Sequence, residues 1–244
     1  MIGNLIYQPK GKALEYAPLA CNVYRGCDHA CVYCYAPLAT HRERVEFNVP
    51  STRSADFLAK LEKEATKQER ANHTGQVLLS FTCDPYQTLD VTEGVTREVI
   101  TILHRHCFDV AILTKGGERA LRDIELLTPR DAFACTLTTL DDAESLKWEP
   151  GAALPADRIA TLELMHDAGI PTWVSLEPVF SPEQVYAIIA RTAHCTDLYK
   201  VGKLNYHPVS REINWRVFAA EVVRVLQLFD KQYYIKEDLR PFCV

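Results

Sequence analysis

Short apolar runs alternate with amphipathic stretches from residue 56 onward. The apolar runs predict buried strands near 77–82, 109–114, 132–138, 172–176 and 198–204. Apolar residues spaced three or four apart predict helices near 56–70, 92–107, 117–127, 156–169, 182–193 and 213–229. Such alternation indicates an α/β fold with a parallel sheet, and a first strand near 19–24 would make six βα units.

Residues able to do chemistry follow the predicted strands. In barrels built from βα units, ligands bind at the carboxyl ends of the strands, so we expect a site at that edge. Periodicity alone does not distinguish a barrel from a doubly wound sheet. With 244 residues, 48% of them hydrophobic, and no linker-like stretch, the chain is expected to form a single domain over residues 1–244.

Three cysteines follow the first predicted strand in a C-x3-C-x2-C arrangement: Cys27, Cys31 and Cys34. Three thiolates suit a [4Fe-4S] cluster with one open iron, whereas a structural zinc ion takes four protein ligands. His29 could complete a Cys3His zinc site, which is the alternative. The chain has nine cysteines and no basic, signal-like N-terminus, which favours free thiols and a cytoplasmic protein over disulfides.

Charge argues against a wide nucleic-acid-binding face, because the formal net charge is -5. His41, Arg42 and Arg44 form a compact basic patch after the cysteine loop. This patch could contact phosphates, or it could be an ordinary solvated helix face. The apolar runs are too short to span a bilayer, so no membrane association is expected.

The cysteine motif, with Tyr33 before its last cysteine, resembles the cluster loop of the radical S-adenosylmethionine (SAM) enzymes. Four further segments are similar to the spore photoproduct lyase-like, or DNA repair photolyase-like, branch: 22–27, 82–87, 113–115 and 121–127. The resemblance covers about residues 18–205 and leaves 206–244 as a C-terminal helix and tail. It implies a partial (βα)6 TIM-type barrel with the cluster loop at the carboxyl end of the first strand.

The resemblance also implies cofactor contacts. Cys27, Cys31 and Cys34 would hold the cluster, with Tyr33 packed beside it. Asp84 would lie near the methionyl amino group of SAM, and Lys115 near its carboxylate. The structural alternatives are an Asx turn before Pro85 for Asp84 and a solvated loop residue for Lys115.

Further contacts are expected at later strand ends. Strand alternation would aim Thr136 and Thr138 to one side, as a ribose-binding pair requires, although threonine is also common in strands. Arg158, in a segment similar to one of the family, could bind the SAM carboxylate. Glu177 is expected at the barrel mouth with Lys203 and Asn205, either lining the cofactor and substrate site or forming an ion pair with Lys203 that closes the sheet.

Tyr35 and Cys83 are the catalytic candidates. The resemblance links the Tyr35 position to radical relay. Where spore photoproduct lyase carries a hydrogen-donor cysteine, this chain has Phe81. Cys83 could replace that cysteine only if its side chain faced the cavity, and strand alternation predicts that residues 81 and 83 lie on the same face. This departure puts repair of spore photoproduct itself in doubt.

The resemblance implies an enzyme that reductively cleaves SAM and abstracts hydrogen with a 5′-deoxyadenosyl radical. The expected substrate is a pyrimidine base in DNA or a modified nucleotide, in lyase, repair or base-modification chemistry, with flavodoxin or ferredoxin as the electron donor. The alternatives are modification of a peptide or small molecule, or a metal-binding module without turnover.

Overall fold

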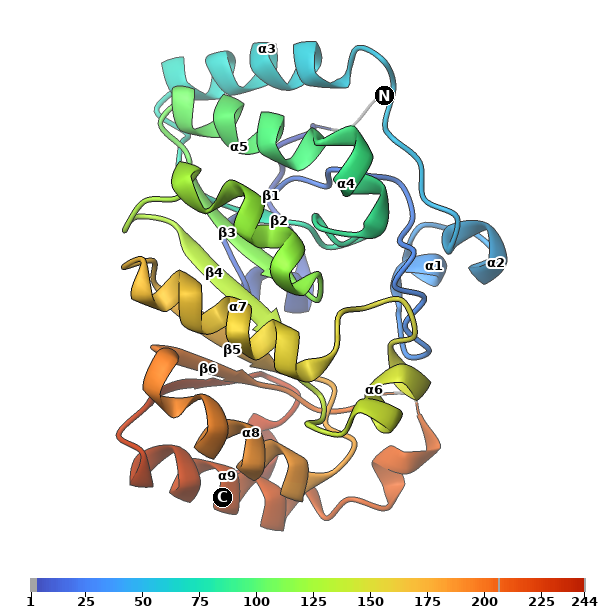
Figure 1. The fold of residues 1–244 in the computed structure, drawn as a ribbon, viewed down its shortest axis with the longest axis vertical. Helices are drawn as coiled ribbons and strands as arrows, with labels where there is room; N and C mark the ends of the chain where they lie inside the picture. Colours follow the sequence, from blue (N-terminus) through green and yellow to red (C-terminus); the bar gives the residue numbers. More distant parts are fainter. Residues whose placement is uncertain (1–3, 206, 244) are drawn as a thin grey trace.

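Seven parallel strands form one sheet in their sequence order in the computed structural model, which describes residues 4–205 and 207–243 (Figure 1). The strands are β1 (Leu19–Ala20), β2 (Gln76–Leu79), β3 (Asp109–Thr114), β4 (Ala132–Thr136), β5 (Thr172–Leu176), β6 (Leu198–Val201) and β7 (Gln232–Ile235). The sheet curls into a partial TIM-type barrel, which confirms the predicted fold class.

Helices cover the outer face of the sheet (Figure 1). They are α3 (Phe57–Arg70), α4 (Thr88–Glu93), α5 (Val95–Arg105), α7 (Pro155–Asp167), α8 (Pro182–Thr192) and α9 (Trp215–Leu228), whereas α6 (Asp142–Trp148) lies beyond the strand ends, beside the cysteine loop. Short α1 (Ala36–Ala39) and α2 (Arg44–Phe47) follow the cysteine loop. The 3-10 segments are η1 (Gly11–Glu15), η2 (Gly117–Leu126), η3 (Ala193–Cys195), η4 (Pro208–Arg211) and η5 (Arg240–Phe242). No helix in the described part of the chain is long and apolar enough to cross a membrane.

Several elements differ from the expected ones, and β1, β2, β4 and β6 end earlier than predicted, at Ala20, Leu79, Thr136 and Val201. The helix expected over 92–107 begins at Val95, because Gly94 adopts φ +62 and ends α4 in the left-handed conformation. Residues 117–127 form a 3-10 helix instead of an α-helix. The region expected as a helix and tail also contains β7, which pairs with β6, so the sheet has seven strands and not six.

One apolar layer packs on each face of the sheet. The main core packs the sheet against the helices and is built from alternate strand residues such as Val110, Ile112 and Val174. On the concave face, the smaller cluster contains Ala111, Ala134 and other small residues around Leu78 and Trp173.

The N-terminal segment crosses the concave face from one edge of the sheet to the other. Tyr7 pairs antiparallel with Ala20 of β1, and η1 follows. At the far edge, the Lys200 ammonium donates to the carbonyls of Glu15 and Tyr16 at 2.9 and 3.0 Å. Burial, with the nearby Lys236 charge, lowers the pKa of Lys200 to about 8. The segment thus ties the β1 edge to the β6–β7 edge.

Candidate active site

The cysteine loop lies at the carboxyl end of the sheet and is clamped from the α1–α2 side (Figure 1). The Phe47 carbonyl accepts from the Cys27 amide at 3.0 Å. The Arg44 guanidinium donates to the carbonyls of Cys31 and Cys34 at 2.9 and 3.0 Å. Arg42 donates to the Glu46 carbonyl. Both alternatives for this basic patch therefore missed the main role of Arg44, which is to brace the loop.

The other side of the loop contacts the chain around α6. The Val32 amide donates to the Trp148 carbonyl at 2.9 Å, and the Gly151 amide donates to the His29 carbonyl at 3.0 Å. A β-carbon on Gly151 would lie 2.2 Å from the Asp28 carbonyl oxygen. Gly151 is therefore required by the close approach of two backbone segments.

We expect Gly151→Ala to lower the free energy of unfolding by about 1–3 kcal/mol, because the added methyl overpacks this contact. It should also lower the iron bound after reconstitution, because the cysteine loop must shift. Gly75→Ala is the matched control, since its β-carbon would meet only Leu19 Cδ1 at 3.9 Å. Urea unfolding and iron analysis test both; equal behaviour of the two variants would contradict this account.

The three thiols suit a cluster better than a single ion. All three cysteines are free. Among the residues described, their sulfurs do not form a group within 4.8 Å of one another, whereas tetrahedral zinc holds sulfurs about 3.8 Å apart. Burial raises the pKa of Cys27, and it raises that of Cys31 to about 11 although the Lys115 charge opposes this. These two thiols therefore hold their protons more tightly in the metal-free protein, and assembly of a cluster must release them.

His29 does not complete a zinc site. Its side chain is buried, and both ring nitrogens already have partners. Nε2 lies 3.2 Å from an Arg119 nitrogen, and Nδ1 lies 3.4 Å from Asp84 Oδ2. Because a guanidinium only donates, Nε2 must accept, which leaves the proton on Nδ1 facing Asp84. The Cys3His alternative is therefore wrong for this structure.

Asp84 connects the ends of β2 and β3 to the cysteine loop. Its carboxylate accepts from the Tyr86 amide at 2.9 Å, the Thr114 hydroxyl at 2.6 Å and the Lys115 amide at 2.8 Å, and it faces His29. Burial would raise the pKa of Asp84, but His29 and these donors lower it. The hydrogen bond from the Tyr86 amide to the Asp84 carboxylate forms an Asx turn, which was the structural alternative to a SAM-binding role for Asp84. Four partners fill the acceptor positions of the carboxylate, so little capacity remains for a ligand ammonium.

The Lys115 ammonium, in contrast, is available to bind a ligand. It makes no hydrogen bond or ion pair with any described residue, and its nitrogen lies 5.8 Å from the centre of the Tyr33 ring. Burial alone would lower the pKa of Lys115. The nearby Cys31, Glu149 and Asp84 charges raise this pKa by more than burial lowers it, so the net shift is upward. A charged lysine beside the cysteine loop is suited to bind a carboxylate.

Thr138 provides a second uncommitted polar group. Its Oγ1 is buried and has no hydrogen-bond partner among the described atoms, as is also true of one side-chain oxygen each of Glu15, Thr196 and Asp238, so this hydroxyl is available to a ligand. Thr136 ends β4, is buried, and its carbonyl accepts from Arg158. Three thiols, an unpaired ammonium and an unpaired hydroxyl together fit an iron–sulfur cluster with SAM.

Arg158 belongs to a buried ion pair and not to an open binding position. Its Nη1 lies 2.6 Å from Glu149 Oε2, and both side chains are 1% exposed. The other Glu149 oxygen accepts a hydrogen bond from the Tyr33 hydroxyl. Burial and the Glu149 charge raise the pKa of Tyr33, so this hydroxyl remains a donor. Arg158 and Glu149 thereby fix Tyr33 beside the cysteine loop.

Glu177 pairs with Lys236, which follows β7, and also accepts from the Tyr16 hydroxyl at 2.6 Å. The expected ion pair with Lys203 is wrong, because the Lys203 ammonium instead lies over the rings of Trp215 and Phe242. The unexpected strand β7 is the reason, since it places Lys236 next to the end of β6.

Tyr35 and Cys83 occupy different surroundings. The Tyr35 hydroxyl donates to the Phe81 carbonyl at 3.0 Å, and Tyr35 is 58% exposed. Phe81 packs on the concave-face cluster, whereas Cys83 packs against the main core, and its sulfur accepts from the Tyr24 amide. Because β2 ends at Leu79, alternation does not extend to these residues. The expectation that residues 81 and 83 share a face is wrong.

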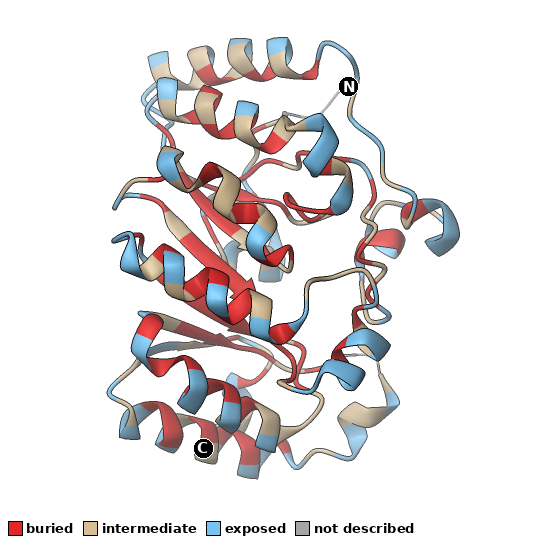
Figure 2. Cartoon of the chain, viewed as in Figure 1, coloured by how far each residue is buried: buried red, intermediate tan, exposed pale blue. Residues whose placement is uncertain are grey.

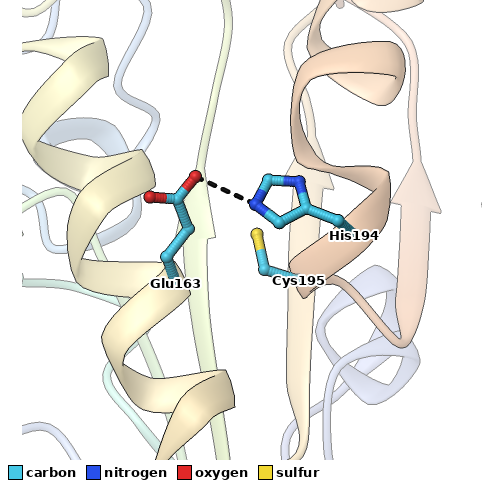
Figure 3. A group of neighbouring side chains, drawn as sticks. All are labelled: Glu163, His194 and Cys195. Carbon is cyan, nitrogen blue, oxygen red and sulfur yellow. Dashed lines mark hydrogen bonds and ion pairs between the residues drawn. The ribbon is translucent and has the colours of Figure 1, made fainter.

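A separate group of ligand-type side chains lies between α7 and η3, which directly precedes the amino end of β6 (Figure 3). Glu163 on α7, with His194 and Cys195 from η3, could approach one ion. However, His194 and Arg191 both contact Glu163 Oε1, at 3.1 and 2.9 Å, and the Cys195 thiol donates to the Thr192 carbonyl. This is a satisfied surface network.

Sequence reasoning missed several of these partners. Glu149 lies 116 residues from Tyr33, and Lys236 lies 59 residues from Glu177. No local pattern predicts such pairs. The one available signal was the presence of ionisable residues directly after apolar runs, which did identify Asp84, Lys115 and Glu177.

Comparison with known proteins adds to this geometry. The family model described as the radical SAM superfamily matches residues 21–194. An uncharacterized protein of Mycobacterium tuberculosis is 28% identical over 180 residues, covering 70% of this chain and 52% of the relative. One of Methanocaldococcus jannaschii is 26% identical over 188 residues, covering 75% and 69%. The chain thus spans about half the length of the mycobacterial relatives.

Solved structures share the fold. Spore photoproduct lyase, as a mutant with bound AdoMet and dinucleoside spore photoproduct, has a TM-score of 0.72 at 13% identity, covering 94% of this chain and 78% of that one. Streptococcus suis SuiB bound to S-adenosylmethionine has a TM-score of 0.65 at 13% identity, covering 89% and 49%.

Proposed function

Because the chain belongs to the radical SAM superfamily, we propose that it removes a hydrogen atom from a pyrimidine base in DNA or from a modified nucleotide, in lyase or base-modification chemistry. In this family, a [4Fe-4S] cluster and SAM supply a 5′-deoxyadenosyl radical. Cys27, Cys31 and Cys34 would hold the cluster, and Lys115 and Thr138 would bind SAM. Asp84 would position Lys115 through its backbone amide.

One observation supports a flat, aromatic substrate: aromatic rings gather on the concave face near the cysteine loop. Tyr16 packs on Phe81 and on Trp173, each with ring centroids 5.9 Å apart. Tyr35, one residue after Cys34, adds an exposed ring bonded to the Phe81 backbone. Trp173 is buried, so Tyr35 is the exposed ring of this group, and an exposed aromatic ring can stack on a nucleobase without sequence preference. The structure of spore photoproduct lyase with its dinucleoside lesion shares the fold and is consistent with such a substrate.

The substrate test compares substrate classes directly. Reconstituted protein is incubated with dithionite and SAM, and then with thymine-containing oligonucleotides, dinucleoside photoproducts, modified nucleosides or peptides. We expect a nucleotide to accelerate 5′-deoxyadenosine formation and to be altered itself. The net charge of -5 favours a second candidate, modification of a peptide or small molecule, because it disfavours polyanion binding. Acceleration by peptides alone would establish that alternative.

Lys115→Met is expected to raise the dissociation constant of SAM at least about tenfold, because a charge-assisted bond to a carboxylate contributes roughly 1.5–3 kcal/mol. Methionine retains most of the side-chain volume. Lys147→Met is the control, since Lys147 is exposed and pairs with Glu144 at 3.1 Å. Equilibrium dialysis with labelled SAM measures both. Unchanged affinity in Lys115→Met would remove Lys115 from the site.

Tyr35→Phe is expected to slow substrate conversion while leaving 5′-deoxyadenosine formation without substrate unchanged. The substitution keeps the ring but removes the hydrogen bond to Phe81 and the hydroxyl hydrogen that a relay needs. Product and 5′-deoxyadenosine are quantified in the same reaction by chromatography. A variant that converts substrate at the original rate would limit Tyr35 to packing.

The proposal includes a cytoplasmic location, which is supported by the free state of all nine cysteines. It also includes a flavodoxin or ferredoxin as electron donor, because the chemistry consumes one electron for each SAM cleaved.

A further inference from the structure

The Glu177 carboxylate has one oxygen bound by the protein and one that is available. β5 is buried along its whole length (Figure 2), and Glu177 is the residue directly after it, with a side chain that is 18% exposed. Its Oε2 accepts from the Tyr16 hydroxyl at 2.6 Å and from the Lys236 ammonium. Its Oε1 accepts no hydrogen bond from any described residue, and it is not one of the buried atoms that lack a partner. A ligand can therefore reach Oε1.

Three neighbours fix the orientation of this carboxylate. Burial and the Glu177 charge raise the pKa of Tyr16 well above its usual value, so the Tyr16 hydroxyl remains a donor to Oε2. The Lys236 ammonium also donates to the Tyr16 hydroxyl, at 3.1 Å, which joins the three side chains into one unit. Gly202 leaves room for the available oxygen, because a β-carbon there would lie 2.7 Å from Glu177 Oε1. An acceptor that is held in place in this way loses little entropy when it binds a donor.

The carboxylate lies at one end of the aromatic group on the concave face. Tyr16, which bonds to Glu177, packs its ring on Phe81 and on Trp173. The exposed ring of Tyr35 joins this group through its hydrogen bond to the Phe81 carbonyl. Burial is the main cause that raises the pKa of Tyr35, and nearby charges that include Glu177 add to it. Glu177 is therefore within electrostatic reach of Tyr35, and a planar ligand stacked on Tyr35 could direct its edge toward Oε1.

The charges around the carboxylate favour a neutral N–H donor over a phosphate or an ammonium. The Lys236 side chain is 4% exposed and pairs with Oε2, which compensates the Glu177 charge and disfavours a second cation. Lys200 is also buried, where it donates to two backbone carbonyls and lies 4.6 Å from the centre of the Trp173 ring. Neither ammonium is therefore presented to a phosphate. Because a carboxylate oxygen only accepts, the ligand of Oε1 must donate.

We propose that Glu177 determines substrate specificity by accepting a hydrogen bond at Oε1 from a ring N–H of a pyrimidine base, such as the imide N–H of thymine. Tyr16, Lys236 and Gly202 act as positioning residues for this oxygen. The inference rests on the proposed function, which supplies the nucleotide substrate. Enzymes that act on an unstacked base read its Watson–Crick edge by hydrogen bonds while its face stacks on aromatic side chains. A thymine that carries a methyl group on this nitrogen should therefore be rejected.

The test compares thymidylyl-thymidine with the same dinucleotide methylated at N3 of both thymines. Equilibrium dialysis with each labelled dinucleotide measures its binding to the reconstituted full chain in the presence of SAM, and 5′-deoxyadenosine formation is measured in parallel. We expect the wild type to bind the unmethylated dinucleotide at least about tenfold more tightly, as for the loss of one hydrogen bond to a charged group. Equal affinities for the two dinucleotides, or no binding of thymidylyl-thymidine, would overturn the inference.

Two variants test whether Glu177 is the source of this selectivity. In Glu177→Gln, the amide oxygen should accept from Tyr16 and Lys236, which turns the amide N–H toward the ligand and should abolish the preference for the unmethylated dinucleotide. Gly202→Ala keeps the charge but displaces the end of the side chain, and it should reduce the same ratio.

The matched control is Glu183→Gln, at an exposed residue that accepts from Ser181 at 2.8 Å. It should keep the wild-type ratio. A purely structural role of Glu177 would lower both affinities alike and leave the ratio unchanged, which would contradict the inference. Binding of a lysine-containing peptide in preference to the dinucleotide, lost in Glu177→Gln, would assign Oε1 to a cation and would also overturn it.

Failure of the proposed function has a different signature. If peptides alone accelerate 5′-deoxyadenosine formation, the nucleotide substrate is wrong. If nucleotides accelerate it but methylation at N3 changes neither binding nor turnover, the proposed function stands and only the role of Glu177 fails.

Discussion

Replacing Cys31 with alanine should abolish both the iron–sulfur absorbance and the cleavage of SAM. Cys31 is 8% exposed, and its carbonyl accepts from Arg44 and from the Cys34 amide. Alanine preserves these backbone contacts and removes only the thiol. The loop should therefore keep its conformation while losing one of the three ligands expected for the cluster, and we expect turnover to fall below detection.

Cys107→Ala provides the control for this prediction. Cys107 is exposed, lies between α5 and β3, and contacts only Glu69 through its thiol. Iron content, visible absorbance and 5′-deoxyadenosine are measured for both variants after anaerobic reconstitution. If Cys31→Ala retains a full complement of iron and wild-type turnover, the assignment of the cluster ligands is wrong.

The second large effect is expected at the buried ion pair. Arg158→Met should lower the free energy of unfolding by about 3–5 kcal/mol, because it leaves the Glu149 carboxylate buried without its cation. The arginine also donates to the carbonyls of Ala153 and Thr136 at 2.7 and 3.0 Å, so its loss leaves further acceptors unsatisfied.

A double-mutant cycle separates the pair from its surroundings. The double variant Glu149→Gln/Arg158→Met should be less destabilised than the sum of the single variants, because neither ion is then left alone. Lys147→Ala, which breaks the exposed pair with Glu144, should cost no more than about 1 kcal/mol. Urea unfolding measures the wild type, the two single variants, the double variant and Lys147→Ala. Additive effects in the cycle, or a cost below about 1 kcal/mol for Arg158→Met, would show that the ion pair is not a unit.

The cysteine loop and the central strands could be predicted from short stretches of the sequence. The cysteine spacing lies within one loop, and the apolar runs of β3, β4 and β5 are short and continuous, so both could be identified without a structure. The apolar runs placed Asp84 and Lys115 after predicted strands, at the edge where ligands gather in parallel sheets, whereas their roles toward SAM were implied by the family resemblance.

Long-range pairing could not be predicted in the same way. Strand β7 is partly exposed and only four residues long, so its pattern was too weak to identify. Without β7, the partner of Glu177 was misassigned to Lys203. Arg158 was expected to bind the SAM carboxylate, whereas in the structure it pairs with the buried carboxylate of Glu149. The early end of β2 changed the environment of Cys83 in a way that strand periodicity cannot indicate.

The most direct test of the central claim is the formation of 5′-deoxyadenosine by the wild-type protein. The protein is reconstituted anaerobically with iron and sulfide, reduced with dithionite and supplied with SAM, and the products are separated by chromatography. The account predicts 5′-deoxyadenosine and methionine in equal amounts, formed only when iron–sulfur absorbance is present. Absence of that absorbance, with zinc bound instead and no SAM cleavage, would contradict it.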